Sequence, residues 1–254
     1  MDKNKLKLKF DQLLKNFAYE LNLDNLNNTF SRFQSGLDNP AWAVRGIVDI
    51  HQNIYPISSD TKLISKVLES QLFPFFSCFA YENDLRLELA SHQNYYPDMT
   101  FIANRNERVK FAVDLKTTYR NPNRPEFCNG FTLGSYMGYF RNRNSGKNIM
   151  YPYDQYIGHF CFCVVYSRYT RNSETEKTIY SVRNVNAIPP AIGDFVFFAH
   201  EKWRIASKTT GSGNTANIGS IKNIEDLYYG KNGAFSSEEE FDEYWMNYAR
   251  TSEE

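Results

Sequence analysis

Two short strings in this sequence carry residue types that could do chemistry together. Pro97-Asp98 and Asp114-Leu115-Lys116 form the pattern Pro-Asp…Asp-x-Lys, with the two aspartates 16 positions apart. Paired carboxylates bind a hard divalent cation, which lowers the pKa of bound water and neutralises charge developing on phosphorus. A lysine beside them would add a positive charge or polarise the attacking water. The pattern therefore suggests phosphodiester hydrolysis, although the same residue types are common as solvated surface charges.

The elements around these residues give the pattern a geometry. Residues 99–103 and 110–117 are predicted to be adjacent strands joined by a charged turn. Asp98 immediately precedes the first strand, and Asp114 and Lys116 lie on the second. Side chains two positions apart on a strand point to the same face, so Asp114 and Lys116 should project together. The sheet is therefore expected to assemble the three groups.

Three helices are predicted from apolar spacing and capping residues. One covers about residues 3–22, and one covers about 238–249, with acidic residues in its first turn. Another runs over about 61–76 after the capping string Ser58-Ser59-Asp60. Glu69 lies on this helix beside its apolar face, where a glutamate is usually exposed.

The remaining segments predict further sheet structure. Residues 211–215, Gly-Ser-Gly-Asn-Thr, read most simply as a hairpin turn, since glycine permits close backbone approach. The other predicted segments are a linker at 24–40, one or two strands at 44–57, a helix passing into a strand at 151–166, and strands at 195–207 and 217–224.

Bulk composition restricts the class of protein. The 254 residues, 42% hydrophobic and 16% aromatic, suffice for one folded domain rich in sheet. No apolar run is long enough to span a membrane, the first ten residues do not form a secretory signal, and the four cysteines lack zinc-ligand spacing. These features predict a cytoplasmic protein with reduced cysteines.

The distribution of charge is more informative than its sum of zero. Residues 236–254 contain seven acids and one base, so the rest of the chain carries a net charge of +6. Residues 116–147 contain six basic residues and one acid. This basic stretch begins at Lys116, and it would suit a nucleic-acid backbone, although it could also be an ordinary solvated loop.

Seven blocks of the sequence, in order, resemble the EcoRV family of type II restriction endonucleases, which belong to the PD-(D/E)XK nucleases. The blocks are residues 54–62, 93–98, 114–119, 131–134, 147–156, 211–221 and 244–252. The resemblance implies an α/β fold with a mixed β-sheet flanked by helices, in a single endonuclease domain over 1–254. Within it, we expect an N-terminal helix and dimerisation region at about 3–57, a catalytic core at about 58–170, and a recognition hairpin with a C-terminal helix at about 171–254.

The resemblance also implies roles for individual residues. Asp98 and Asp114 would be metal ligands together with the backbone carbonyl of Leu115, and Lys116 would be the catalytic lysine. Glu69 would be an additional active-site acid and a further metal ligand. The implied cofactor is Mg²⁺, which favours oxygen ligands and retains several waters. Whether one or two ions bind is left open.

The implied substrate is double-stranded DNA, bound by a homodimer at a palindromic site. The family likeness predicts the sequence GATATC, cut at its easily kinked centre to blunt ends with 5′-phosphates. The residues implied in base recognition are Gly211, Ser212, Gly213, Asn214, Thr215, Gln93 and Asn94. Those implied in backbone contact are Thr61, Thr118, Thr132 and Lys147.

Two alternatives and one departure accompany this hypothesis. A repair or structure-specific nuclease of the same fold would not need the base-reading loop 211–215, and a non-catalytic DNA-binding protein would gain nothing from carboxylates near phosphates. The family likeness also implies a basic tail where this sequence is acidic. Either basic residues such as Arg141, Arg143 or the lysines of 1–10 replace it, or non-specific DNA affinity is lower.

Overall fold

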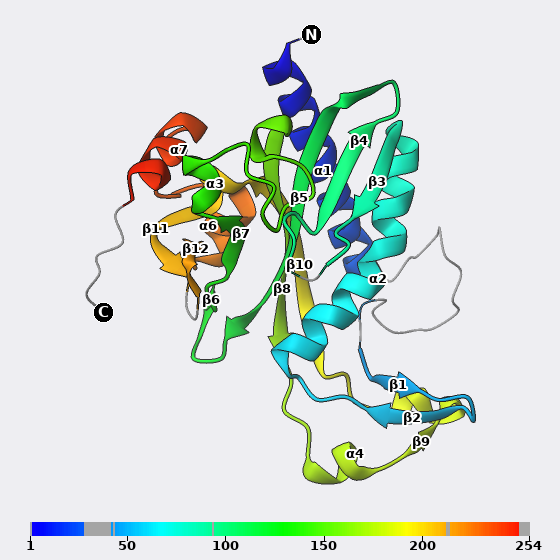
Figure 1. The fold of residues 1–254 in the computed structure, drawn as a ribbon. Helices are drawn as coiled ribbons and strands as arrows, with labels where there is room; N and C mark the ends of the chain where they lie inside the picture. Colours follow the sequence, from blue (N-terminus) through cyan, green and yellow to red (C-terminus); the bar gives the residue numbers. More distant parts are fainter. Residues whose placement is uncertain (1, 28–41, 43, 93, 212–213, 249–254) are drawn as a thin grey trace.

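The fold is built on a mixed β-sheet, seen in the computed structural model, which describes residues 2–27, 42, 44–92, 94–211 and 214–248 (Figure 1). Within these residues the sheet has six strands in the order β10-β8-β5-β4-β3, with β6 paired to β5. The β5–β8 pair is parallel and the other pairs are antiparallel. The predicted mixed α/β fold is therefore confirmed. The strands are β3 (Leu85–Leu89), β4 (Met99–Ala103), β5 (Asn106–Asn121), β6 (Arg124–Cys128), β8 (Gly158–Arg168) and β10 (Ile192–Glu201).

Strand β8 lies in the interior and separates two apolar cores. Its residues from Gly158 to Tyr166 are all buried, as expected for a strand that is covered on both faces. Alternate side chains pack into different cores: Phe160 and Phe162 face one, and Cys161 and Cys163 face the other. The same alternation on β5 decides on which side of the sheet Asp114, Leu115 and Lys116 lie.

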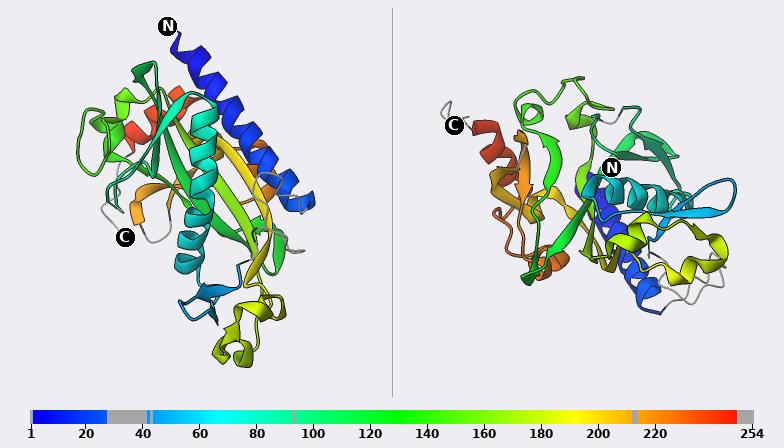
Figure 2. Two further views of the ribbon diagram at one scale, coloured as in Figure 1. Left: turned by 90° about the vertical axis from the view of Figure 1, so that its right-hand side faces the viewer. Right: turned by 90° about the horizontal axis from the view of Figure 1, so that it is seen from below.

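Helices α1 (Lys3–Asn27) and α2 (Thr61–Glu82) cover the first face of the sheet (Figure 2). Phe10 of α1 stacks on Phe111 of β5, with ring centroids 4.1 Å apart. The side chain of Asp60 caps α2 by accepting hydrogen bonds from two backbone N–H groups. Helix α2 contains Pro74 and continues beyond residue 76, where the sequence predicted its end. It continues because its buried apolar face extends to Phe79 and Ala80.

The opposite face carries a second sheet of three described strands, in the order β11-β12-β7, together with short helices. The prediction of one strand over 195–207 was wrong. Strand β10 ends at Glu201, a helical turn follows, and the chain then enters the second sheet. Residues 151–166 were predicted to pass from a helix into a strand. The helical part is a single 3₁₀ turn (Tyr153–Gln155), and β8 follows it. The elements on this side are β7 (Thr132–Tyr136), α3 (Gly138–Arg141), α5 (Lys202–Ile205), β11 (Ala206–Gly211), β12 (Asn214–Ser220), α6 (Ile224–Tyr229) and α7 (Glu238–Asn247).

A third, small sheet projects from one end of the molecule (Figure 1). It comprises β1 (Gly46–Val48), β2 (Asn53–Pro56) and β9 (Tyr180–Ser181), flanked by α4 (Ser173–Lys177) and the 3₁₀ segment Val182–Ala187. All four cysteines are free thiols. In the part of the chain that the structure describes, no helix is long and apolar enough to cross a membrane.

Candidate active site

The pairing of β4 with β5 brings Asp98 and Asp114 together. Met99 of β4 pairs with Val113 of β5 in an antiparallel ladder. Asp98, which precedes Met99, therefore lies beside Asp114, which follows Val113. The backbone N–H of Asp98 donates to Oδ1 of Asp114 (3.1 Å), and the backbone N–H of Leu115 donates to Oδ2 of Asp98 (2.8 Å). Each carboxylate is thus held by the backbone of the other strand, which fixes both in place.

Lys116 completes this cluster from the same strand as Asp114. Its Nζ lies 3.6 Å from Asp98 Oδ2 and 3.8 Å from Asp114 Oδ1. Strand alternation therefore places the ammonium beside both carboxylates, in the arrangement expected from the sequence.

The charges of the cluster act on one another. Burial raises the pKa of the Asp98 carboxyl, and the neighbouring Asp114 adds to this effect against the opposing charge of Lys116. Burial would also raise the pKa of Asp114, but Lys116 and Lys202 outweigh it, so the pKa of Asp114 lies below its usual value. Burial alone would lower the pKa of Lys116, but Asp114 and Asp98 raise it. Lys116 is therefore a cation at neutral pH.

Two residues that sequence reasoning missed lie against Asp114. Lys202, the first residue of α5, is buried and its Nζ donates to Asp114 Oδ2 at 2.6 Å. Gly134 of β7 has a φ of +75°, and a Cβ atom there would lie 2.1 Å from the same oxygen. No local sequence pattern links either residue to Asp114, because the contacts join strands far apart in the chain.

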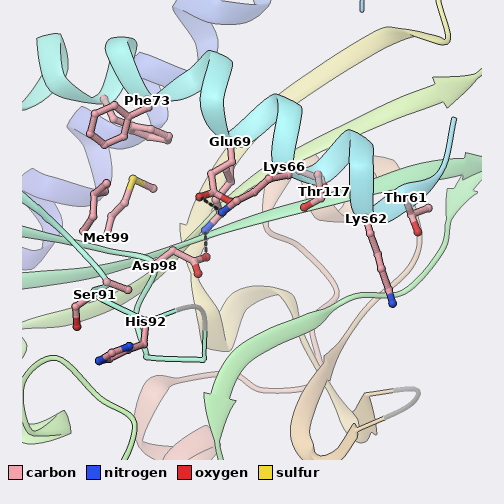
Figure 3. A pocket seen from close by; sticks show the side chains of 15 residues that line it. Thr61, Lys62, Lys66, Glu69, Phe73, Ser91, His92, Asp98, Met99 and Thr117 are labelled. Carbon is pink, nitrogen blue, oxygen red and sulfur yellow. Dashed lines mark hydrogen bonds and ion pairs between the residues drawn. The ribbon is translucent and has the colours of Figure 1, made fainter. Parts of the chain in front are cut away.

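Glu69 lies apart from this cluster, on the wall of a pocket of about 870 Å³ (Figure 3). Its side chain is 50% exposed and pairs with Lys66 at 2.7 Å. Asp98 lines the same pocket, as does Leu115, whose side chain packs toward the α1–α2 side of β5. The pocket therefore lies on the opposite face of β5 from the Asp114 side chain. Asp98 both lines this pocket and contacts Asp114.

The residues implied in base recognition are only partly within the described chain. Gln93, Ser212 and Gly213 lie outside it, as do the side chains of Asn214 and Thr215. Gly211 ends β11 and Asn214 begins β12, so the predicted hairpin joins these two strands. Asn94 is exposed.

The residues implied in backbone contact are dispersed around the site. Thr61 begins α2 and is exposed, and Lys147 is also exposed. Thr132 lies in β7 opposite Gly219 of β12, beside the hairpin. Thr118 is buried, and its hydroxyl donates to the carbonyl of Asn129 at 2.6 Å.

Two of the basic residues considered as replacements for a basic tail are engaged within the protein. Arg141 donates to the carbonyl oxygens of Met246 and Tyr248 at the end of α7. Arg143 forms an ion pair with Asp242 at 2.6 Å. Both guanidinium groups therefore hold α7 in this structure.

The donor set of the cluster fits a hard divalent cation. Asp98 Oδ2 and Asp114 Oδ1 both lie near Lys116 Nζ, so the two carboxylates present oxygens to a common region. Among the described residues, no three His, Cys, Asp or Glu side chains gather closely enough to hold a metal. A cation here would have few protein ligands and would keep several waters, as Mg²⁺ characteristically does.

Comparison with known proteins gives a consistent result. Residues 38–254 match the family model described as restriction endonuclease EcoRV. The chain is also 40% identical over 217 residues to the type II restriction enzyme EcoRV of Escherichia coli, a match that covers 85% of this chain and 86% of that protein.

Proposed function

Because the chain belongs to the EcoRV family of type II restriction endonucleases, we propose that it cuts both strands of GATATC as a Mg²⁺-dependent homodimer. The enzyme is a site-specific deoxyribonuclease of this family, and the family uses a divalent metal. The observation that carries the proposal is the contact of Asp98, Asp114 and Lys116 on two paired strands.

In the proposed reaction, water attacks phosphorus in line and the 3′ oxygen leaves, which gives 5′-phosphate ends. Asp98 and Asp114 would hold Mg²⁺ with the backbone carbonyl of Leu115, while Glu69 would face the substrate from the other wall of the pocket. The ion would supply a water of lowered pKa and neutralise charge on the phosphate. Lys116 would contribute as a cation, since its raised pKa keeps it protonated, and would stabilise negative charge on the phosphoryl oxygens.

A homodimer is supported by the surface of the small β1-β2-β9 sheet. Ile47 is 56% exposed, Val48 54%, Tyr55 43% and Ile179 59%. Ile47 and Tyr55 pair across β1 and β2, so these two exposed apolar side chains lie on one face, as is typical of protein interfaces. A two-fold dimer would place one cutting site at each strand of a palindrome, so that both strands break in one complex.

Recognition is proposed to reside in the β11–β12 hairpin. Gly211 packs so closely on Thr132 that a Cβ would lie 2.2 Å from Thr132 Cγ2, so the start of the hairpin is braced against β7. Asn214 would read base edges in the major groove through its donor and acceptor, while residues 93–94 would face the minor groove. Thr61, Thr118, Thr132 and Lys147 would orient the phosphate backbone without reading sequence.

The whole chain is proposed to act as one endonuclease domain in the cytoplasm, where its free cysteines would remain reduced. Lys7 of α1 is paired with Glu201 and Glu238, and Arg141 and Arg143 are engaged with α7. The other lysines at the start of α1, Lys3, Lys5 and Lys9, therefore remain the candidates for non-specific DNA contacts.

Plasmid cleavage tests this function. The substrates are two plasmids that differ only in whether a single GATATC site is intact, incubated with Mg²⁺ or with EDTA, and the ends are sequenced. We expect one blunt cut, only with Mg²⁺ and only at the intact site, and no cut by an Asp114→Asn variant that circular dichroism shows to be folded. Absence of discrete fragments would refute the restriction activity, a cut elsewhere would refute the proposed site, and staggered ends would refute central cleavage.

A further inference from the structure

Lys202 is a buried lysine in direct contact with the proposed metal-binding carboxylate. Its side chain is 1% exposed, and its Nζ lies 2.6 Å from Asp114 Oδ2 and 4.1 Å from the centroid of the Tyr96 ring. A buried charge is costly unless it is paired, and here Asp114 is the charged partner. The position of this cation must therefore be considered together with the function of that carboxylate.

The two oxygens of Asp114 face different surroundings. Oδ2 is covered by Lys202 on one side and by Gly134, where no Cβ could fit, on another. Oδ1 accepts from the Asp98 N–H and lies on the side of Lys116. A cation bound between the two aspartates would therefore meet Oδ1, while Lys202 holds the other oxygen of the same group.

The charges of the cluster also balance. Asp98 and Asp114 carry two negative charges, and Lys116 and Lys202 supply two positive ones within 4 Å. A divalent cation that enters this cluster gains less attraction than it would gain from two carboxylates with a single lysine, because Lys202 repels it. The lysine that orients Asp114 therefore also limits metal affinity.

We propose that Lys202 is a positioning residue: it anchors Oδ2 of Asp114 so that Oδ1 faces Asp98 and Lys116, and it holds metal affinity down in the absence of DNA. The inference rests on the metal-dependent reaction proposed above. It assigns to Lys202 two effects of opposite sign, since its loss should strengthen metal binding and slow cleavage. If Lys202 served only to fill the core, removing its charge would leave the affinity for the metal unchanged.

The test is Lys202→Met in the full-length protein, which keeps an unbranched side chain one heavy atom shorter and removes the charge. Calorimetric titration with Mn²⁺ without DNA should give a dissociation constant at least about tenfold tighter than that of the wild type. The rise in melting temperature on adding Mn²⁺ should be correspondingly larger. Cleavage at saturating Mg²⁺ should be slower by about a hundredfold, because Asp114 is no longer held.

Matched variants separate charge from packing. Lys202→Arg retains the charge and should keep the wild-type Mn²⁺ affinity, while Lys15→Met removes a lysine paired with Asp11 on α1 and should change neither property. Lys202→Gln is uncharged but can still donate one hydrogen bond to Oδ2, and it serves as the test if the Met variant does not fold.

Unchanged or weaker Mn²⁺ affinity in the folded uncharged variants would overturn the inference, as would undiminished cleavage by the folded Met variant, which has no donor for Oδ2. These outcomes differ from failure of the proposed function, in which the wild-type protein itself would neither bind Mn²⁺ nor cut DNA with Mg²⁺.

Discussion

The two sides of β5 hold their acidic residues in contrasting ways. Asp114 is 2% exposed, and both of its oxygens accept hydrogen bonds, from Lys202 and from the backbone of Asp98. Glu69 on the other side is half exposed and pairs with Lys66, three positions earlier on the same helix. The carboxylate of Asp114 is fixed by contacts from α5, from β7 and from the residue that precedes β4, and that of Glu69 is attached to the surface of one helix.

Because of this difference, Asp114 is held in one position, whereas Glu69 can move. The orientation of Asp114 is set before any ligand arrives, which is how catalytic groups avoid reorganisation during reaction. Glu69 can change rotamer at little cost, because an exposed lysine–glutamate pair contributes at most about 1 kcal/mol. The cleft thus combines a rigid side with an adjustable one, and Asp98 lies between them.

The strongest test of the rigid side is Gly134→Ala. The added Cβ would meet Asp114 Oδ2 at 2.1 Å and Lys116 Nζ at 3.0 Å, and the φ of +75° disfavours alanine independently. We expect cleavage to fall by about a thousandfold or more, since misplaced catalytic groups lose large parts of their effect. Single-turnover cleavage of plasmid DNA measures the loss.

Gly146→Ala is the matched control, because a Cβ at Gly146 would meet no atom within 4 Å. Its cleavage rate should stay within a few-fold of the wild type. Circular dichroism must show that the Gly134 variant is folded. Normal cleavage by that folded variant would contradict a rigid arrangement around Asp114.

His200 of β10 is a buried histidine on the same side of the molecule as Lys202. Its burial predicts that the stability of the protein depends on pH. Burial lowers the pKa of His200 to about 4, although its Nε2 contacts the Tyr228 carbonyl at 3.0 Å. An unfolded histidine titrates near 6.5, so between about pH 6.5 and 4 the unfolded state binds more protons than the native state. Stability is therefore unaffected above this window and should fall by about 3 kcal/mol across it.

Urea denaturation of wild type and His200→Gln over this pH range measures the effect. The variant should lose stability less steeply, but not become flat, since burial also lowers the pKa of His159. His51→Gln, at an exposed position, should retain the wild-type slope. Parallel slopes in the wild type and the His200 variant would mean that this side is more hydrated than its packing indicates.

The same contrast explains how much of the site the sequence could predict. Asp98, Asp114 and Lys116 were found because strand alternation and the pairing of two consecutive strands are local rules. The helix that carries Glu69 was also predicted. It extends further than predicted because the packing of its buried face outweighs the unfavourable Pro74.

Lys202 and Gly134 could not be predicted in this way. Lys202 was expected within a strand over 195–207, whereas α5 interrupts that strand and turns the side chain to Asp114, 88 positions away. Gly134 reaches the site because β7 belongs to a different sheet from β5. Contacts between sheets depend on how the chain crosses from one to the other, which residue spacing does not encode.

The smallest expected effect comes from the adjustable side, in Glu69→Gln. The side chain lines the pocket with Asp98 but is not held against it, so its charge acts over distance and through water. We expect cleavage to fall by about tenfold at low Mg²⁺ and by less at saturating Mg²⁺, because the remaining carboxylates still bind the ion. A titration of cleavage rate against Mg²⁺ measures both limits.

Glu107→Gln is the control for this variant, since Glu107 is an exposed glutamate at the start of β5 that pairs with Arg86 of β3. It should leave the Mg²⁺ dependence unchanged. If Glu69→Gln instead abolished cleavage at every Mg²⁺ concentration, as Asp114→Asn is expected to do, Glu69 would have to be fixed as tightly as Asp114 once DNA is bound. The two sides of β5 would then differ only before the substrate arrives, and closure of α2 onto Asp98 would have to be part of the reaction.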